Sequence, residues 1–249
     1  ILRESTAGGA FTAIAKYVLH NNGVVFGVEL GTDLMAHHVA VEKENDLYRF
    51  RNSKYVQSSV GEGTHRQIKS FLQQGRFVCF SGTPCQIEGL KNFLKKDYDN
   101  LITVDVVCRA VPSPLIFRKY VEYQKKVLSD NIKTVRFRDK HYGYKYSTMN
   151  VITDRNHGNY YQGVESDPWL RAFSLIFVTD HRAIHVISES SIVLVILRYG
   201  IALMLAGSQK NWIMTKGLRE FWCIQKREEK SLMQLRMTSL TLKSHQKPL

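Results

Sequence analysis

The sequence predicts an α/β protein with a mainly parallel sheet and flanking helices, followed by a C-terminal tail that is not expected to fold natively. Up to about Ser174, short apolar segments and amphipathic segments follow one another in the pattern of strands, turns and helices. Turn residues such as Asn21-Asn22-Gly23 and Gly75 close these segments. The alternation stops near Ser174, and the last residues of the chain show no clear periodicity.

Helices and strands are expected in regular order along this first part. A helix is expected within residues 5–23, because Phe11, Ile14, Ala15 and Val18 recur at helical spacing before the turn. The segment 64–75 is amphipathic, which predicts a second helix, and two late segments predict a strand pair. The expected strands are 23–30, 36–42, 76–82, 100–108, 133–139 and 146–153, and the remaining helices are 84–96 and 113–128.

The composition is that of a globular protein with a substantial core. The chain has 249 residues, of which 44 % are hydrophobic and 23 % are charged. Its four cysteines are too few for a disulfide scaffold at this length, and a reduced, cytoplasmic setting fits them better. The apolar run 192–206 contains Arg198 and is shorter than the roughly 20 residues of a membrane span, so no integral span is expected.

The net charge of +13 bears on possible partners. A basic balance fits nucleic acid, anionic lipid or polyanionic cofactors, and it fits a scattered basic surface equally well. No Lys/Arg run is dense enough for a nucleic-acid tract and no nucleic-acid signature is present, so nucleic acid is not an expected partner. The sequence begins at Ile1, just before the first helix, and we expect a fragment that lacks its beginning.

Two cysteines are expected at one edge of the sheet. Cys85 follows Gly82 and Pro84 at a strand–helix junction, where the positive end of the helix dipole favours a thiolate. Cys108 ends the next expected strand, and ligands of open α/β sheets bind beyond the carboxyl ends of strands. The pair would supply half of a four-thiolate iron–sulfur site, and the alternative is two small buried residues. Cys79 lies inside a strand and is expected in the core.

A second candidate site lies nearer the N-terminus. Ser5, Gly8 and Gly9 belong to the segment "STAGGAF", whose glycines leave backbone N–H groups at a helix start open to an anion. The alternative is a small-residue turn that packs closely. Lys54 and Tyr55 add a cation and an aromatic ring in the polar segment "NSKYVQSS", which is otherwise an ordinary solvated loop.

Five segments, taken in order, resemble one family: "STAGGAFTAIAKYVL", "GVVFGVEL", "SKYVQSSVGEG", "VCFSGTPCQIEGLKNFL" and "LITVDVVCRAVPSPLIFRKY". They are similar to the coenzyme F420 hydrogenase/dehydrogenase beta-subunit family, over residues 3–174. The resemblance implies an iron–sulfur flavoprotein with a 4Fe-4S cluster and FAD. It also implies electron transfer with the deazaflavin coenzyme F420 or another redox coenzyme, and an electron-transfer protein as partner.

The resemblance assigns roles to particular residues of this chain. Cys85 and Cys108 match the family's cysteines and are expected to be cluster ligands. The flavin or cofactor contacts that it implies are Ser5, Gly8, Gly9, Lys54, Tyr55 and Thr83. No catalytic acid or base is assigned.

The sequence departs from the family pattern after the second cysteine. Arg109-Ala110 stands where the family usually has His-Gly, the preceding ferredoxin-like segment is absent, and the later Cys-x-x-Cys pair does not appear. In a shifted reading frame the genetic code permits "YLRNRPSCYTCHF" for residues 175–188, which contains such a pair. We therefore expect a frameshift near Ser174, a tail without consistent folding preferences, and a chain that is inactive or nearly so.

The resemblance and the frame argument together divide the chain into three regions. Residues 1–57 are expected to be the N-terminal part of the F420 hydrogenase beta-subunit-like region, and 58–174 its C-terminal α/β region. Residues 175–249 are expected to be the frameshifted tail.

The expected function is that of an oxidoreductase, and two alternatives from other classes stay open. Cys85 could be the nucleophile of a thiol enzyme, although no histidine lies close to it in sequence and His37 and His38 are expected to be structural. The chain could instead be a non-enzymatic basic module that binds a membrane or polyanion surface. Only the apolar run and positive charge of the tail support that alternative.

Overall fold

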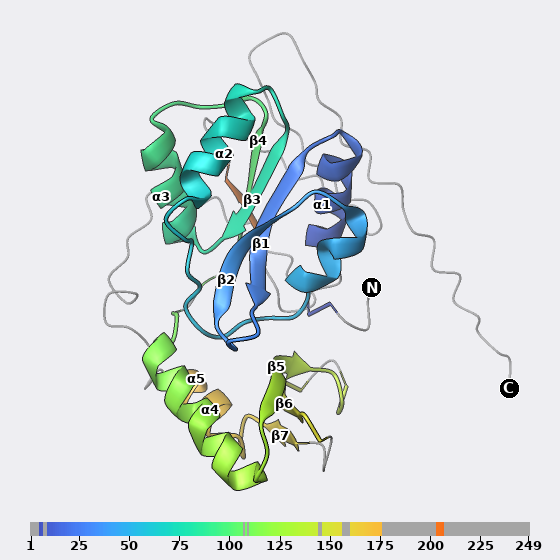
Figure 1. Cartoon of the computed structure of the whole chain (residues 1–249), viewed down its shortest axis with the longest axis vertical. Helices are drawn as coiled ribbons and strands as arrows, with labels where there is room; N and C mark the ends of the chain where they lie inside the picture. Colours follow the sequence, from blue (N-terminus) through green and yellow to red (C-terminus); the bar gives the residue numbers. More distant parts are fainter. Residues whose placement is uncertain are drawn as a thin grey trace, which may run out of the picture. The chain divides into compact units, whose positions relative to one another are not determined.

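The computed structural model describes residues 5–6, 9–106, 108, 110–143, 146–155 and 160–175, and the backbone of 203–206. The described strands form two sheets (Figure 1). Most of the predicted tail, from residue 176 on, lies outside the described residues, so the predictions about its folding and its reading frame stay predictions.

The larger sheet has the order β2-β1-β3-β4-β8. Its strands are β1 (Val24–Leu30), β2 (Ala36–Val41), β3 (Val78–Gly82), β4 (Leu101–Val106) and β8 (Leu203–Ala206). The three central strands β1, β3 and β4 run parallel, while β2 and β8 pair antiparallel at the two edges. The α/β prediction with a parallel core is therefore confirmed, and the antiparallel edges are a detail that it did not include.

Helices cover both faces of this sheet. α1 (Ala10–His20) lies on one face, and α2 (Thr64–Gln73) and α3 (Pro84–Leu94) lie on the other (Figure 1). On β3, Val78 and Phe80 pack with α2 and α3, whereas Cys79 packs with the core beneath α1. Because both faces are buried, the strands read as continuous apolar runs rather than as alternating ones. Cys79 is fully buried, as predicted.

A smaller antiparallel sheet follows in the chain. It contains β5 (Ile132–Asp139), β6 (Thr148–Thr153) and β7 (Tyr160–Gly163), in that order. α4 (Pro114–Leu128) and α5 (Pro168–Ser174) pack with it around Phe117, Phe137 and Trp169. The predicted strand pair is confirmed as β5 and β6.

Several local differences from the sequence prediction have simple causes. The first helix begins at Ala10 rather than near Ser5, because Gly9 has a left-handed backbone conformation with φ 90° that the helix cannot continue through. β4 ends at Val106, so Cys108 lies two residues beyond the strand rather than at its end. The 3₁₀ helix η1 (Glu44–Phe50), β7 and α5 were not predicted, because elements of four to seven residues are too short to show periodicity.

None of the helices within the described ranges has the length and apolar character needed to cross a membrane.

Candidate functional site

The carboxyl ends of β3 and β4 bring the two predicted cysteines to the same edge of the sheet. Gly82 at the end of β3 pairs with Asp105 on β4. From there the chain enters α3, which carries Cys85, and on the neighbouring strand it continues to Cys108. Both cysteines are exposed. The order of two adjacent parallel strands therefore creates the thiol pair, as expected from the sequence.

The two thiols are coupled electrostatically. Cys108 is exposed as a residue, but the protein around its sulfur displaces part of the water. This desolvation raises the pKa of the Cys108 thiol above its ordinary value, and the negative charge of the Cys85 thiolate adds to the effect. Repulsion of this kind acts only over short distances in a protein. A positive ion bound between the two sulfurs would relieve it.

The turn that carries Cys85 is tightly built. The backbone N–H of Thr83 donates to Oε1 of Gln86 over 2.9 Å, and Pro84 occupies the first turn of α3, where no intrahelical donor is needed. A Cβ atom at Gly82 would lie 3.0 Å from Oε1 of Gln86, so a larger residue there would press on the Gln86 side chain. The Thr83 hydroxyl lies 3.1 Å from the Cys85 sulfur and can donate to it when the sulfur is a thiolate.

A second loop braces this turn from the side. Nε2 of Gln86 donates to the hydroxyl oxygen of Ser58 over 3.0 Å and to its carbonyl oxygen over 3.3 Å. The next residue, Ser59, pairs with β2, because its N–H donates to Ala36 and its carbonyl accepts from the His38 N–H. Through Gln86 and the loop at Ser58-Ser59, the start of α3 is thereby connected to β2, an edge strand of the larger sheet.

The side chain of His38 fills the place where β1 and β3 separate. Registered pairing of these strands ends at Phe26 and Phe80. Nε2 of His38 then donates to the carbonyl oxygen of Ser81 over 3.0 Å, and the ring stacks on Phe80 with 5.2 Å between centroids. Burial lowers the pKa of His38, so the neutral ring with its proton on Nε2 is favoured. Nothing close in sequence links His38 to Cys85, and sequence reasoning missed this contact.

Asp105 is the one strongly perturbed acid at this edge among the described residues. Its side chain is buried, and Oδ1 has no hydrogen-bond partner in the described part of the chain. Burial raises its pKa to about 6, against the opposing attraction of Lys91 on α3. The sequence shows Asp105 only as one polar residue in an apolar strand, which is a weak signal for a buried acid.

The glycine-rich turn and the Lys54 loop lie together. Ser5 is buried, Gly9 precedes α1, and the backbone N–H of Ser53 donates to the Thr6 hydroxyl over 3.2 Å. The first turn of α1 has no acidic residue and no side-chain cap, which leaves its N–H groups available. The predicted contact at Gly8 lies outside the described residues.

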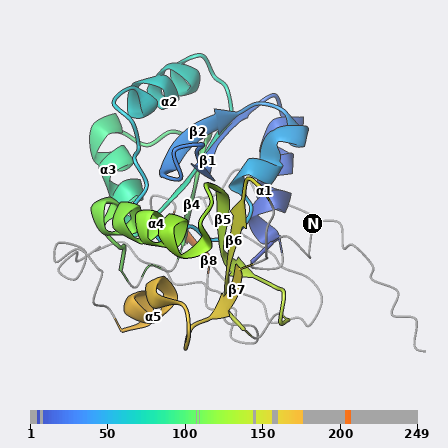
Figure 2. The ribbon, with the colours of Figure 1, turned by 60° about the horizontal axis from the view of Figure 1, so that its bottom comes forward.

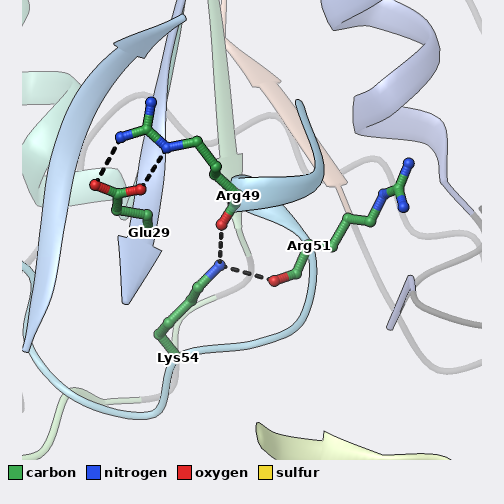
Figure 3. A network of polar contacts seen from close by, with 4 residues as sticks. All are labelled: Glu29, Arg49, Arg51 and Lys54. Atoms are coloured by element: carbon green, nitrogen blue, oxygen red, sulfur yellow. Dashed lines mark hydrogen bonds and ion pairs between the residues drawn. The ribbon is translucent and has the colours of Figure 1, made fainter. Parts of the chain in front are cut away.

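Lys54 is directed at the protein backbone. Its ammonium nitrogen donates to the carbonyl oxygens of Arg51, over 2.9 Å, and Arg49, over 3.3 Å, at the end of η1 (Figure 3). Burial lowers its pKa to about 7, against the attraction of Glu29, which forms a two-pronged ion pair with Arg49. The guanidinium of Arg51 points away from the other three side chains in Figure 3. Lys54 therefore closes a helix end, and two of its hydrogens are used there.

The ring of Tyr55 belongs to a packed aromatic cluster. It stacks on Phe173 with 4.6 Å between centroids and meets Phe137 edge-on at 6.0 Å. Its carbonyl oxygen accepts a hydrogen bond from the Trp169 indole over 3.2 Å. Tyr55 thus anchors the loop that continues to Ser58, and both ring contacts are with the core of the smaller sheet.

Among the described residues, two thiols are candidate cluster ligands, which is fewer than the four that a 4Fe-4S cluster needs. No group of three or more His, Cys, Asp or Glu side chains that could hold a metal is found among them. Cys79 lies fully buried in the core beneath α1, where burial raises its pKa to about 12. Cys223 and the segment in which the shifted frame would place a further pair lie outside the described residues.

Part of the chain matches a known family model. Residues 75–166 match the family model for the C-terminal part of the coenzyme F420 hydrogenase/dehydrogenase beta subunit. The matched range contains Thr83, Cys85 and Cys108. No curated protein matches the sequence.

A solved structure shares the fold. It is a chain of the xenon-derivatised F420-reducing [NiFe] hydrogenase complex from Methanosarcina barkeri, with a TM-score of 0.50 and 13 % sequence identity. The similarity covers 84 % of this chain and 71 % of that one. At this identity the likeness is one of fold.

Proposed function

Since residues 75–166 belong to the coenzyme F420 hydrogenase/dehydrogenase beta-subunit family, a family of oxidoreductases, we propose that this chain is an iron–sulfur flavoprotein. It would pass electrons between a reduced coenzyme, F420 or a similar one, and a redox partner protein. The observation that carries the proposal is the pair of exposed thiols, Cys85 and Cys108, at the end of two adjacent parallel strands.

The surroundings of Cys85 suit a thiolate ligand. Cys85 lies in the first turn of an 11-residue helix, where the helix dipole stabilises negative charge. The Thr83 hydroxyl can donate to the same sulfur, and the brace from Gln86 to Ser58 holds the turn in place. When bound by four such ligands, an iron–sulfur cluster supplies one-electron transfer. Thr83, Cys85 and Cys108 would hold and orient one side of it.

The absence of two further thiolate ligands is the basis for proposing that this chain is impaired. Two thiolates leave half of a four-iron cluster without protein ligands, and a cluster held in this way would be lost readily. The family's later cysteine pair is absent from the sequence, and we propose that a frameshift near Ser174 removed it. We propose that residues 58–174 carry the cluster-binding cysteines and that residues 1–57 carry the flavin-binding turn. The two regions share one sheet, because β1 from the first pairs with β3 from the second.

We assign flavin binding to the turn formed by Ser5, Gly8 and Gly9 together with the Lys54 loop. The N–H groups at the start of α1 would donate to a phosphate oxygen. Lys54 and Tyr55 support this assignment through the loop that they hold, because the Lys54 ammonium binds backbone carbonyls and the Tyr55 ring packs in the core. Their contribution would be to position the loop.

The described contacts give less support to the thiol-nucleophile alternative. A cysteine nucleophile of that kind needs a positioned base. The described polar contact of Cys85 is the hydroxyl of Thr83, and Nε2 of His38 is engaged with Ser81. No second function is proposed.

Anaerobic reconstitution of the full chain with iron, sulfide and FAD tests the proposal. We expect substoichiometric, labile iron that disappears in Cys85→Ser and in Cys108→Ser but persists in Cys79→Ala, the matched control for loss of a buried thiol. Iron that binds equally well without Cys85 and Cys108 would overturn the ligand assignment. A stable, stoichiometric cluster in the chain as written would instead contradict its impairment.

A further inference from the structure

One helix, α4, is apolar on two sides. α4 lies beside β5 (Figure 2). The side of α4 that faces the core carries Phe117, Tyr120 and Val121, which are buried in it. Four further large apolar side chains of α4 are exposed to solvent. They are Leu115 (62 % exposed), Ile116 (39 %), Tyr123 (53 %) and Val127 (54 %). The outer surface of a helix in a globular protein is usually polar, so this second apolar side needs an explanation.

Three of these side chains form a continuous stripe. Residues seven and eleven positions apart lie nearly above one another on a helix of 3.6 residues per turn, so Ile116, Tyr123 and Val127 fall within about 40° of each other. Leu115 lies farther around the exposed surface. Tyr123, in the middle of the stripe, is the kind of large side chain that dominates protein interfaces.

Basic residues border the stripe on its solvent side. Lys119 and Lys126, also seven positions apart, lie between the stripe and Leu115, and both are exposed. Arg118 and Lys125 project from the opposite side of the helix surface and are exposed as well. Within the described part of the chain, none of these four side chains is recorded in an ion pair.

We propose that this surface, the α4 docking face, binds an acidic electron-transfer protein. The face consists of Leu115, Ile116, Lys119, Tyr123, Lys126 and Val127. An apolar centre with a basic border complements a partner surface in which acidic residues surround an apolar patch. A second copy of this chain would bring two net-basic faces together across a two-fold axis, because the exposed Glu122 beside Lys119 and Lys126 offsets only one of their two charges. This disfavours self-association. The electron-transfer role of the partner rests on the proposed function.

The position of α4 in the chain connects the face to the thiol edge. α4 begins at Pro114, and Leu115 lies seven residues after Cys108, a span that cannot exceed about 25 Å even when fully extended. Between them, the carbonyl of Pro112 accepts from the N–H of Gln57, next to the loop that braces the Cys85 turn. A partner on this face would be held near the candidate cluster.

The test is direct binding of the full chain to a purified acidic ferredoxin, used as the probe, by calorimetry at low and high salt. We expect salt-sensitive binding that Lys119→Glu/Lys126→Glu weakens by about tenfold or more, as does Tyr123→Ser. The matched control is Arg118→Glu/Lys125→Glu, which makes the same charge change at the same spacing on the other side of α4. It should change the dissociation constant less than about twofold.

Each other outcome would overturn the proposal. Equal loss in both charge-reversal pairs, or equal binding of a basic cytochrome c of similar size, would indicate unspecific attraction. Self-association abolished by Tyr123→Ser would make a second copy the occupant, and binding to anionic vesicles without binding to ferredoxin would make a membrane the occupant. No ferredoxin binding at all would also overturn it. Thermal unfolding of each variant shows that the fold is intact.

Binding is measured without cluster or flavin, so it fails or succeeds separately from reconstitution. Binding without iron dependent on Cys85 and Cys108 would leave the docking face standing and remove the proposed function. Iron that depends on Cys85 and Cys108, without ferredoxin binding, would leave the proposed function standing and remove the docking face.

Discussion

Nε2 of His38 lies 3.0 Å from the carbonyl oxygen of Ser81, although β1 separates the strands that carry the two residues. The contact exists because β1 and β3 stop pairing after Phe26 and Phe80, which leaves the Ser81 carbonyl at a splayed end of the sheet. His38 supplies the missing donor. The chain from Ser81 leads directly into the turn that presents Cys85, so the position of that thiol depends on a residue 47 positions earlier in the sequence.

Replacing His38 should weaken the fold in a pH-dependent way. His38→Ala leaves the part-buried Ser81 carbonyl without its donor and should lower the free energy of unfolding by about 1–3 kcal/mol, whereas His38→Gln should lower it less. The folded pKa of His38 is lowered below its ordinary value of 6.5, so the folded state binds fewer protons than the unfolded state near and below that pH. Stability should therefore fall as pH falls through 6.5 and below.

Urea unfolding of the wild type and both variants, at neutral and mildly acidic pH, measures these effects. In the Gln variant the acid-dependent part of the loss should be smaller. His20→Gln is the control, because the His20 side chain is mostly exposed. A wild type and a Gln variant that lose equal stability on acidification would show that His38 does not contribute.

The apo chain offers a test of the distance between the two thiols. Because the Cys85 thiolate raises the pKa of Cys108, Cys85→Ser should lower that pKa and accelerate alkylation of Cys108 at a fixed pH below it. Peptide-resolved mass spectrometry after timed iodoacetamide treatment measures the rate. Cys79→Ala, which removes a buried thiol elsewhere, should leave it unchanged. An unchanged rate in Cys85→Ser would mean that the two thiols are not neighbours.

Local patterns predicted the parts of the site that are carried by single elements. The apolar runs placed β3 and β4, and Gly82 with Pro84 marked the turn, so two parallel strands predicted a shared thiol edge. The braces from Gln86 to Ser58 and from His38 to Ser81 join segments 28 and 43 residues apart, and a local pattern carries no information about such contacts. The polar loop around Lys54 indicates a surface cation, whereas the structure buries its ammonium against backbone carbonyls at the end of η1. The sequence pattern could not show this, because the burial depends on how η1 ends.

Lys54 should make stability rise with pH above neutrality. Its folded pKa is about 7 and its ordinary value is 10.5, so between these values the unfolded state binds the extra proton. The free energy of unfolding should increase across this window, because the folded state holds a neutral amine that still donates to two carbonyls. Lys54→Met should flatten the increase.

Chemical unfolding at pH 7 and at about pH 9 measures the slope. Lys43→Met is the control, because Lys43 is exposed. If Lys54→Met keeps the wild-type slope but abolishes FAD binding, Lys54 contacts the cofactor directly and does not act through the loop.

The last prediction concerns Asp167, which links the smaller sheet to the loop beside the thiol edge. Its fully buried carboxylate accepts from the Leu170 N–H over 2.7 Å and from the hydroxyls of Tyr120 and Tyr160 over 2.7 and 2.9 Å. It thus begins α5, whose Trp169 donates to the carbonyl of Tyr55.

Asp167→Ala removes the helix cap and leaves the buried Tyr120 hydroxyl and the part-buried Tyr160 hydroxyl without this acceptor, so it should lower the free energy of unfolding by about 3 kcal/mol. Asp167→Asn keeps a cap and should lose less. Burial raises the pKa of Asp167 above 3.8 in spite of its hydrogen bonds, so the folded state binds the extra proton over that window. The wild type should therefore lose stability as pH rises from 3.8 through the raised value, and the Asn variant should not show this loss. Urea titrations across that range measure both effects, and equal stability of the Ala and Asn variants would show that α5 does not depend on this cap.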